Sequence, residues 1–190
     1  MIGFGAATRA ESFSFEYKHL LIPQKCDIDA IKSEDLETNR FGGTVITSHD
    51  ALRTLVHDGN AYVYPTDYKD LKLIAELFDL EREARKNMLG CAWQNAPIAN
   101  ADSITKTEQF YIVTGRVLDT YESYENIYLN FGEDWKTDFT VRIQKKNKAF
   151  KGYDFESLQG KNIEVRGFVE YYNGPSLTLE HPALIKEIIE

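Results

Sequence analysis

Apolar residues occupy every second position along most of the C-terminal half of the chain, from Gln109 onward. This period-two pattern predicts β-strands that each bury one face. The alternating positions are Ile127, Leu129 and Phe131; Phe139, Val141 and Ile143; Ile163, Val165 and Val169; and Leu177 and Leu179. Turn residues separate these runs at 132–134, 160–161 and 173–175.

The order of these runs predicts a particular architecture for residues 108–190. Three strands come first, the segment AFKGYDFESL follows as a short helical piece, and two more strands complete the series. This is the element order of an OB-fold, which is a small Greek-key barrel. The sequence therefore predicts a second unit built as one small barrel.

The first half of the chain carries a mixed pattern. Residues 10–21 have apolar side chains at helical spacing, and Pro23 would end such a helix. Gly59 and Gly90 stand where glycine commonly ends a helix. The pattern predicts five further elements: strands at 25–31 and 43–48, a short helix capped by Asp50, a short extended piece at 61–65, and a long helix over about 67–89 that is capped by Thr66.

Composition and charge narrow the classes of function. Apolar residues make up 43% of the chain, which is enough for packed cores, and the formal net charge is −8. Tight nucleic-acid binders usually present a basic patch, so this charge disfavours strong nucleic-acid binding without excluding it. No apolar run approaches the ~18 residues that span a bilayer. We therefore expect no membrane insertion, and a soluble intracellular protein of a bacterial cytoplasm or an organelle such as the mitochondrion.

Cysteines and histidines give no catalytic or metal-binding spacing. Cys26 and Cys91 are the only cysteines, and we interpret both as reduced, half-buried small residues. The alternative is a single bridge between them in an oxidising compartment. The four histidines are scattered, and no nucleophile elbow is present. We therefore expect no metal and no cofactor, and we expect His181, which precedes Pro182, to cap local structure.

Two long motifs carry a resemblance to a known family. The run NRFGGTVITSHDALRTLVHDGNAYVYP and the later EREARKNMLGCAW resemble the second half of a staphylococcal-nuclease-like (thermonuclease) domain, over Phe13–Trp93. The motifs within Tyr128–Ile143 and Gly160–Ile185 are similar to an extra OB-type domain that follows the nuclease domain in some bacterial members.

The resemblance implies a chemistry whose residues this chain lacks. Members of the family use carboxylates to hold Ca²⁺, a Glu to activate water, and two Arg side chains to stabilise the phosphoryl charge. The metal-binding Asp and the general-base Glu fall on Gly5 and Thr8, and the second Arg falls on Gly43. The remaining family positions would precede residue 1. The resemblance thus implies a degenerate, N-terminally truncated domain without nuclease activity.

Together these observations predict the class and the division of the chain. The class is α+β, mostly β, with two small OB-type barrels and a long helix between them. Residues 1–93 form the truncated nuclease-like unit, residues 94–107 form a linker rich in Asn, Ala, Ser and Thr, and residues 108–190 form the OB-fold. The first barrel lacks opening strands, so its edge would be covered by the second unit or by a partner chain.

The outward face of the second barrel is the candidate binding surface. If the alternating apolar residues point inward, polar and aromatic residues on the same strands and in the adjoining loops point outward. These residues are Tyr121, Tyr124, Tyr128, Asn130, Arg142, Tyr171, Tyr172 and Asn173. OB-folds bind single strands on this face, and tyrosine is equally common in protein interfaces.

The charges around this surface rank the two interpretations. Four carboxylates adjoin it: Glu122, Glu125, Glu133 and Asp134. We therefore predict a non-catalytic, nuclease-derived scaffold that binds other protein subunits of a larger assembly. The alternative is binding of single-stranded nucleic acid through the OB-fold, and a remote alternative is residual Ca²⁺-dependent nuclease activity.

Overall fold

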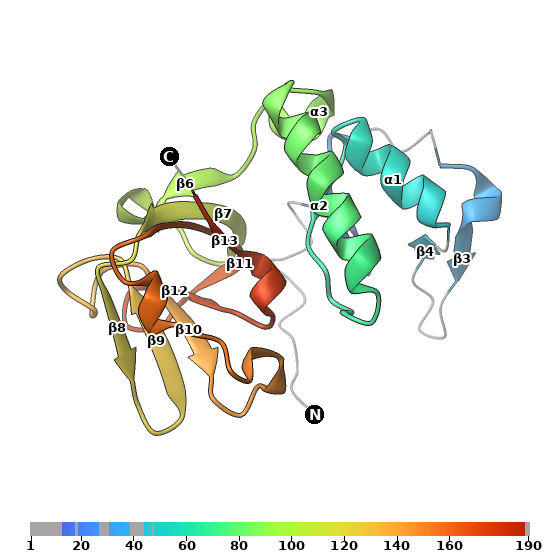
Figure 1. The fold of residues 1–190 in the computed structure, drawn as a ribbon. Helices are drawn as coiled ribbons and strands as arrows, with labels where there is room; N and C mark the ends of the chain where they lie inside the picture. The colour runs from blue at the N-terminus through green and yellow to red at the C-terminus, as the bar shows by residue number, and fades with distance from the viewer. Residues whose placement is uncertain (1–12, 18, 27–30, 39–43, 47, 189–190) are drawn as a thin grey trace. The chain divides into compact units, whose positions relative to one another are not determined.

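Figure 1 shows the fold of the 190-residue chain as a computed structural model. The chain divides into two compact units, Met1–Ala96 and Pro97–Glu190. The structure describes residues 13–17, 19–26, 31–38, 44–46 and 48–188.

Unit 1 combines two small sheets with helices. A three-stranded sheet has the order β1-β2-β5, and β3 pairs with β4 in a separate ribbon. The elements are β1 (Phe13–Tyr17), β2 (Leu20–Pro23), η2 (Ser33–Asp35), β3 (Leu36–Thr38), β4 (Thr44–Ile46), α1 (His49–His57), β5 (Tyr62–Val63), α2 (Leu71–Lys86) and α3 (Gly90–Trp93).

The prediction of a helix over residues 10–21 is wrong, because the described residues of this segment lie in the antiparallel hairpin of strands β1 and β2. Leu20, Leu21 and Ile22 are consecutive and at most 1% exposed. A strand covered on both faces carries a continuous apolar run, so burial overrides the apparent helical spacing. The strand predicted at 25–31 is also absent from its described part, where the Cys26 N–H donates to the carbonyl of Pro23 at 2.9 Å and closes a turn.

The predicted helices are present with shifted starts. Ser48, and not Asp50, caps α1 by accepting the N–H of Ala51. Asp70, and not Thr66, caps α2 by accepting the N–H of Leu73 at 2.9 Å. These side chains accept backbone donors that the first helical turn leaves without partners.

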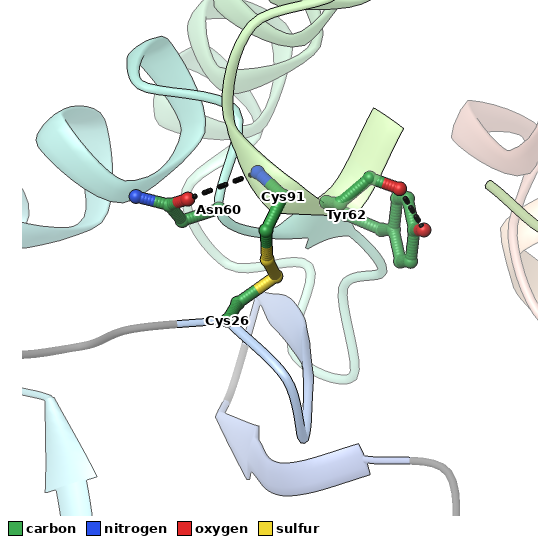
Figure 2. The surroundings of a disulfide bond; sticks show 5 residues. Cys26, Asn60, Tyr62 and Cys91 are labelled. Carbon is green, nitrogen blue, oxygen red and sulfur yellow. Dashed lines mark hydrogen bonds between the residues drawn. A yellow bond between two sulfur atoms is a disulfide. The ribbon is translucent and has the colours of Figure 1, made fainter. Parts of the chain in front are cut away.

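The two cysteines of unit 1 are joined in a disulfide, with 5.4 Å between their Cα atoms. Our interpretation of both as reduced is therefore wrong, and the bridged alternative holds. The partners are separated by 65 residues in the sequence. Only the tertiary fold brings the turn after β2 against the start of α3, as Figure 2 shows.

Unit 2 is a single strongly bent sheet with short 3-10 turns. Its strand order is β6-β7-β11-β12-β10-β9-β8, and β13 also pairs with β11. The elements are β6 (Ile98–Asn100), η3 (Ala101–Ser103), β7 (Gln109–Arg116), β8 (Asp119–Glu122), β9 (Asn126–Asn130), β10 (Thr140–Gln144), η4 (Lys148–Phe150), η5 (Glu156–Leu158), β11 (Asn162–Tyr171), β12 (Pro175–Thr178), η6 (Pro182–Leu184) and β13 (Ile185–Glu187).

The strand pairing of unit 2 is that of the OB order. Strands β10 and β12 pair in parallel, whereas β7 with β11, β8 with β9, β9 with β10 and β11 with β12 are antiparallel. Only Val117 and Leu118 separate β7 from β8. The N–H of Val117 donates to the carbonyl of Lys161 in front of β11, and that of Leu118 donates to Asn130 of β9. The bent segment between β7 and β8 therefore hydrogen-bonds both to the residue before β11 and to β9, as the bent first strand of an OB-fold bonds to two different strands.

The predicted class, α+β and mostly β, is confirmed by this element content. The expectation of two barrels is only partly met. The sheets are not closed barrels: the end strands of the unit 2 sheet, β6 and β8, do not pair with each other, and unit 1 has a small sheet and a ribbon. Part of the predicted linker at 94–107 is also structured, because β6 pairs in parallel with β7.

The core of unit 2 follows the alternation of the sequence. Leu129, Val141 and Leu177 face one another across neighbouring strands, and each is fully buried. Gly115 allows a close approach, because a Cβ there would lie 2.8 Å from the ring of Phe131 and 2.9 Å from the side chain of Ala101. The alternation thus leaves the residues between these core positions on the outward face.

His181 caps η6, as the sequence suggested. Its Nδ1 accepts the N–H of Ala183 at 3.1 Å, which requires that this nitrogen carry no proton. Desolvation by burial lowers the pKa of His181 below its ordinary value. Folding therefore favours the neutral imidazole.

We predict that unit 2 loses stability as the pH falls below about 6.5, the ordinary histidine pKa. Below that pH the unfolded chain binds a proton at His181, whereas the folded chain does not, so unfolding becomes more favourable. This loss of stability is complete once the pH reaches the lower pKa of His181 in the folded chain. His181→Asn keeps an acceptor for the N–H of Ala183 and removes the titration. Urea unfolding at pH 7.5 and 5.5 should show a smaller pH dependence for this variant, and an equal pH dependence would contradict the prediction.

Candidate functional site

A row of side chains crosses four neighbouring strands on the outward side of unit 2. Tyr121 of β8 is opposite Tyr128 of β9, Tyr128 is opposite Arg142 of β10, and Arg142 is opposite Thr178 of β12. Because side chains alternate along a strand, these four residues share the face opposite the core. We call Tyr121, Tyr128, Arg142 and Thr178 the tyrosine row.

Contacts along the tyrosine row hold its members in place. The rings of Tyr121 and Tyr128 are stacked, with centroids 6.1 Å apart and an interplanar angle of 27°. Arg142 donates from Nη2 to Thr178 Oγ1 at 2.9 Å, and its guanidinium carbon lies 4.7 Å from the ring centroid of Tyr172. The row is therefore arranged before any ligand arrives, which lowers the entropy cost of binding.

Amide and hydroxyl groups border the row on both sides. Asn126 donates from Nδ2 to the hydroxyl of Tyr128 at 3.3 Å. Asn130, a predicted site residue, accepts at Oδ1 from the hydroxyl of Thr140 at 3.4 Å. The outward face thus offers neutral hydrogen-bonding groups around its aromatic rings.

Two turns carry the other predicted aromatic residues. Tyr124 stands in the β8–β9 turn and is 95% exposed. In the β11–β12 turn, Asn173 has a φ of +51°, a conformation that Asn tolerates better than most residues. The N–H of Tyr172 donates to the carbonyl of Gly174 across this turn. Asn173 therefore acts through the backbone, by shaping the turn that places Tyr172 over Arg142.

Tyr171 is separated from the row. It pairs with Pro175, two positions from the Val169–Leu177 pair, whose side chains face the core. Strand alternation therefore assigns Tyr171 to the face opposite Arg142, and its position at the strand end leaves it 72% exposed. Of the eight predicted residues, the structure joins Tyr121, Tyr128, Arg142 and Tyr172 directly, while Tyr171 lies apart.

Sequence reasoning missed Trp135, which is 54% exposed in the loop before β10. The Nζ of Lys136 lies 5.5 Å from its ring centroid. The loop is braced by the N–H of Asp134, which donates to Asp138 Oδ2 at 2.8 Å. A Cβ on Gly174 would lie 2.9 Å from the backbone of Thr137, so this loop and the Tyr172 turn are neighbours. The sequence did carry a signal for this residue, because a single Trp stands there within a polar run rich in turn residues.

The charge near the row is less acidic than the sequence suggested. Glu122 pairs in register with Ile127, which puts it on the face opposite Tyr121, and its carboxylate forms an ion pair with Lys145. Asp134 accepts the N–H of Lys136 at 3.0 Å. The tyrosine row itself contains one cation, Arg142. Glu125, Glu133 and Asp134 therefore keep the border of the row acidic, whereas Glu122 is removed from it.

The nuclease-like positions Gly5, Thr8 and Gly43 lie outside the described residues. Within the described ranges, no cluster of three or more His, Cys, Asp or Glu has the arrangement of a metal site. The same part of the chain contains no helix with the length and apolarity that a membrane crossing requires.

Comparison with known proteins adds little to this geometry. No protein-family model matches the chain, and no curated protein matches it. Among solved structures, part of the chain is similar to Entamoeba histolytica asparaginyl-tRNA synthetase in complex with asparaginyl-adenylate, with a TM-score of 0.35 and 13% identity. That match covers 49% of this chain and 24% of the synthetase chain. The OB assignment therefore rests on the strand order and register described above.

We predict that Arg142→Lys destabilises unit 2 by about 1 kcal/mol, because Lys lacks the planar fork that bonds Thr178 and covers Tyr172. Urea unfolding followed by Trp135 fluorescence in a Trp93→Phe background would measure this loss. Lys151→Ala, at an exposed position, is the control and should change the unfolding free energy by less than about 0.5 kcal/mol. Equal stability of Arg142→Lys and the parent would show that the contacts of Arg142 contribute nothing.

Proposed function

We propose that this chain is a non-catalytic, nuclease-derived binding protein whose unit 2 contacts a partner protein through the tyrosine row. The observation that carries the proposal is the pre-arranged row itself, with stacked Tyr121 and Tyr128 and with Tyr172 over Arg142. The proposed role is that of a subunit in a larger protein assembly.

The chemistry of the row suits a protein partner. Tyrosine brings a large contact area with few rotatable bonds, and aromatic residues and Arg are enriched in interface centres. Tyr121 is 59% exposed and Tyr172 is 52% exposed, so their rings are accessible. The net charge of −8, together with Glu125 and Glu133 at the border, favours a basic segment on the partner, because complementary charge speeds association.

The first test removes the two accessible rings of the surface. We expect Tyr121→Ala with Tyr172→Ala to weaken partner binding by at least tenfold, because two aromatic anchors are lost from one patch. Tyr121→Phe with Tyr172→Phe keeps the rings and should retain most of the affinity. Copurification from the native source, followed by sizing at physiological salt and titration of the recovered partner, would measure these effects.

Tyr171→Ala is the matched control, because Tyr171 is exposed, adjacent in sequence and on the opposite face. Its partner affinity should equal that of the parent chain. Raising the salt concentration should slow association by screening the acidic border. If Tyr171→Ala weakens binding as much as the double variant does, the row is not the contact surface.

Single-stranded nucleic acid is the second candidate ligand, and one observation favours it. The centre of the row, Tyr128 and Arg142, lies on β9 and β10, which are the second and third strands of the OB order, beside the turns that carry Tyr124 and Tyr172. OB-folds bind oligonucleotides on this face, and stacking on an aromatic ring contributes ~1–3 kcal/mol per base. One cation in the row is few for tracking a phosphate backbone, which ranks this candidate second.

Fluorescence anisotropy with a labelled single-stranded oligonucleotide separates the two candidates. At physiological salt we expect a dissociation constant above about 10 μM, because the row offers little counterion release. Sub-micromolar binding that Tyr121→Ala with Tyr172→Ala abolishes would instead place nucleic acid first.

We also propose that the chain hydrolyses neither DNA nor RNA, with or without Ca²⁺. The support is the sequence, which places Gly5, Thr8 and Gly43 where the resembled family needs two carboxylates and an Arg. A plasmid and a labelled RNA should remain intact after hours with the purified chain and millimolar Ca²⁺. Metal-dependent cleavage that follows the protein through successive columns would refute this prediction.

A further inference from the structure

Two turns of unit 1 cross at close contact. Gly59 follows α1 with a φ of +72°, and Gly90 follows α2 with a φ of +61°. A Cβ on Gly59 would lie 2.1 Å from the carbonyl oxygen of Leu89, and one on Gly90 would lie 2.4 Å from the carbonyl oxygen of Gly59. Both the conformation and the contact require glycine here, so the crossing has a defined geometry.

This crossing positions Cys91 at the start of α3. The Cys91 N–H donates to Asn60 Oδ1 at 3.4 Å, and the Ala92 N–H donates to the carbonyl of Gly59 at 3.0 Å. The Tyr62 hydroxyl donates to the carbonyl of Ala92 at 2.6 Å, which Figure 2 shows beside the disulfide. Burial raises the pKa of Tyr62 well above its ordinary value, so the donor stays protonated.

Cys26 joins the N-terminal hairpin to this framework. It lies in the turn after β2 and is 7% exposed. Strand β2 pairs with β5 through only two residue pairs, Leu20 with Val63 and Leu21 with Tyr62. The disulfide is therefore the covalent link between the hairpin and the end of the helical segment.

We propose that unit 1 depends on this disulfide, and that the protein works in an oxidising compartment and not in a reducing cytoplasm. Closing a loop of 65 residues restricts the unfolded chain strongly. Cytoplasmic thiol systems keep such pairs reduced, whereas secreted, periplasmic and other oxidising environments preserve them. Two thiols lose two electrons and two protons to form the bond. A second disulfide in the compartment, belonging to a small molecule or to an exchange protein, accepts these electrons and protons and is reduced to two thiols.

The two tryptophans allow each unit to be followed separately in the full chain. Trp93 is 3% exposed in unit 1, where its ring lies 5.1 Å from that of Tyr62, and Trp135 lies in unit 2. Trp135→Phe leaves Trp93 as the reporter of unit 1. Trp93→Phe leaves Trp135 as the reporter of unit 2.

Thermal unfolding with and without a reducing agent tests whether the stability of unit 1 depends on the disulfide. In the Trp135→Phe chain we expect reduction to lower the Tm reported by Trp93 by at least ~10 °C. Cys26→Ser with Cys91→Ser should show the same low Tm in both conditions. In the Trp93→Phe chain the Tm reported by Trp135 should not change. A change of less than about 2 °C at Trp93 on reduction would overturn the dependence of unit 1 on the disulfide.

Thiol trapping in the native source tests the compartment. Cells are lysed directly into acid and denaturant, and free thiols are alkylated with a mass-tagged maleimide. We expect no label on the untreated protein, and two labels after reduction with a phosphine. Two labels without reduction would overturn the compartment proposal. Neither result depends on the tyrosine row, so this inference and the proposed function can fail separately.

Discussion

The hydrogen bonding of one bent segment to two different strands is the constraint on which unit 2 depends. Val117 donates to the strand entry at Lys161, and the next residue, Leu118, donates to Asn130. This change of partner turns the chain from the β7–β11 pair into the β8–β9 pair. Without it, β8 would not extend the sheet, and Tyr121 would have no Tyr128 to stack on. The candidate site is therefore a product of the bend and of the alternation that it preserves.

The same alternation separates residues that are adjacent in sequence. Tyr171 and Tyr172 are consecutive, yet the first continues the core side of β11 and the second covers Arg142. The single guanidinium of the row is already engaged by Thr178 and Tyr172. A surface with well-placed rings and one engaged cation favours ligands that bind through packing and neutral hydrogen bonds over those that need many free cations.

Unit 1 is organised by different means. Its sheets are small, and its buried residues gather where β2, β5 and the helices meet. Two glycines in a left-handed conformation let the turns after α1 and α2 cross, and a disulfide ties the N-terminal hairpin to the same place. Buried Glu81 accepts the N–H of Val63 at 2.7 Å, which links α2 to the short strand β5. Covalent and polar links thus act beside the apolar core of unit 1.

The sequence by itself determined the features that depend on neighbours along the chain. Period-two alternation identified the inward faces of β9, β10 and β12, and turn residues identified their ends. The helices α1 and α2 were also recognisable, with starts displaced by their true caps, Ser48 and Asp70. The tertiary structure decided whether residues 20–22 were helix or strand, because their burial on both faces comes from distant segments. It alone joined Cys26 to Cys91 and placed Tyr172 over Arg142, since such contacts between remote residues leave no periodic trace in a sequence.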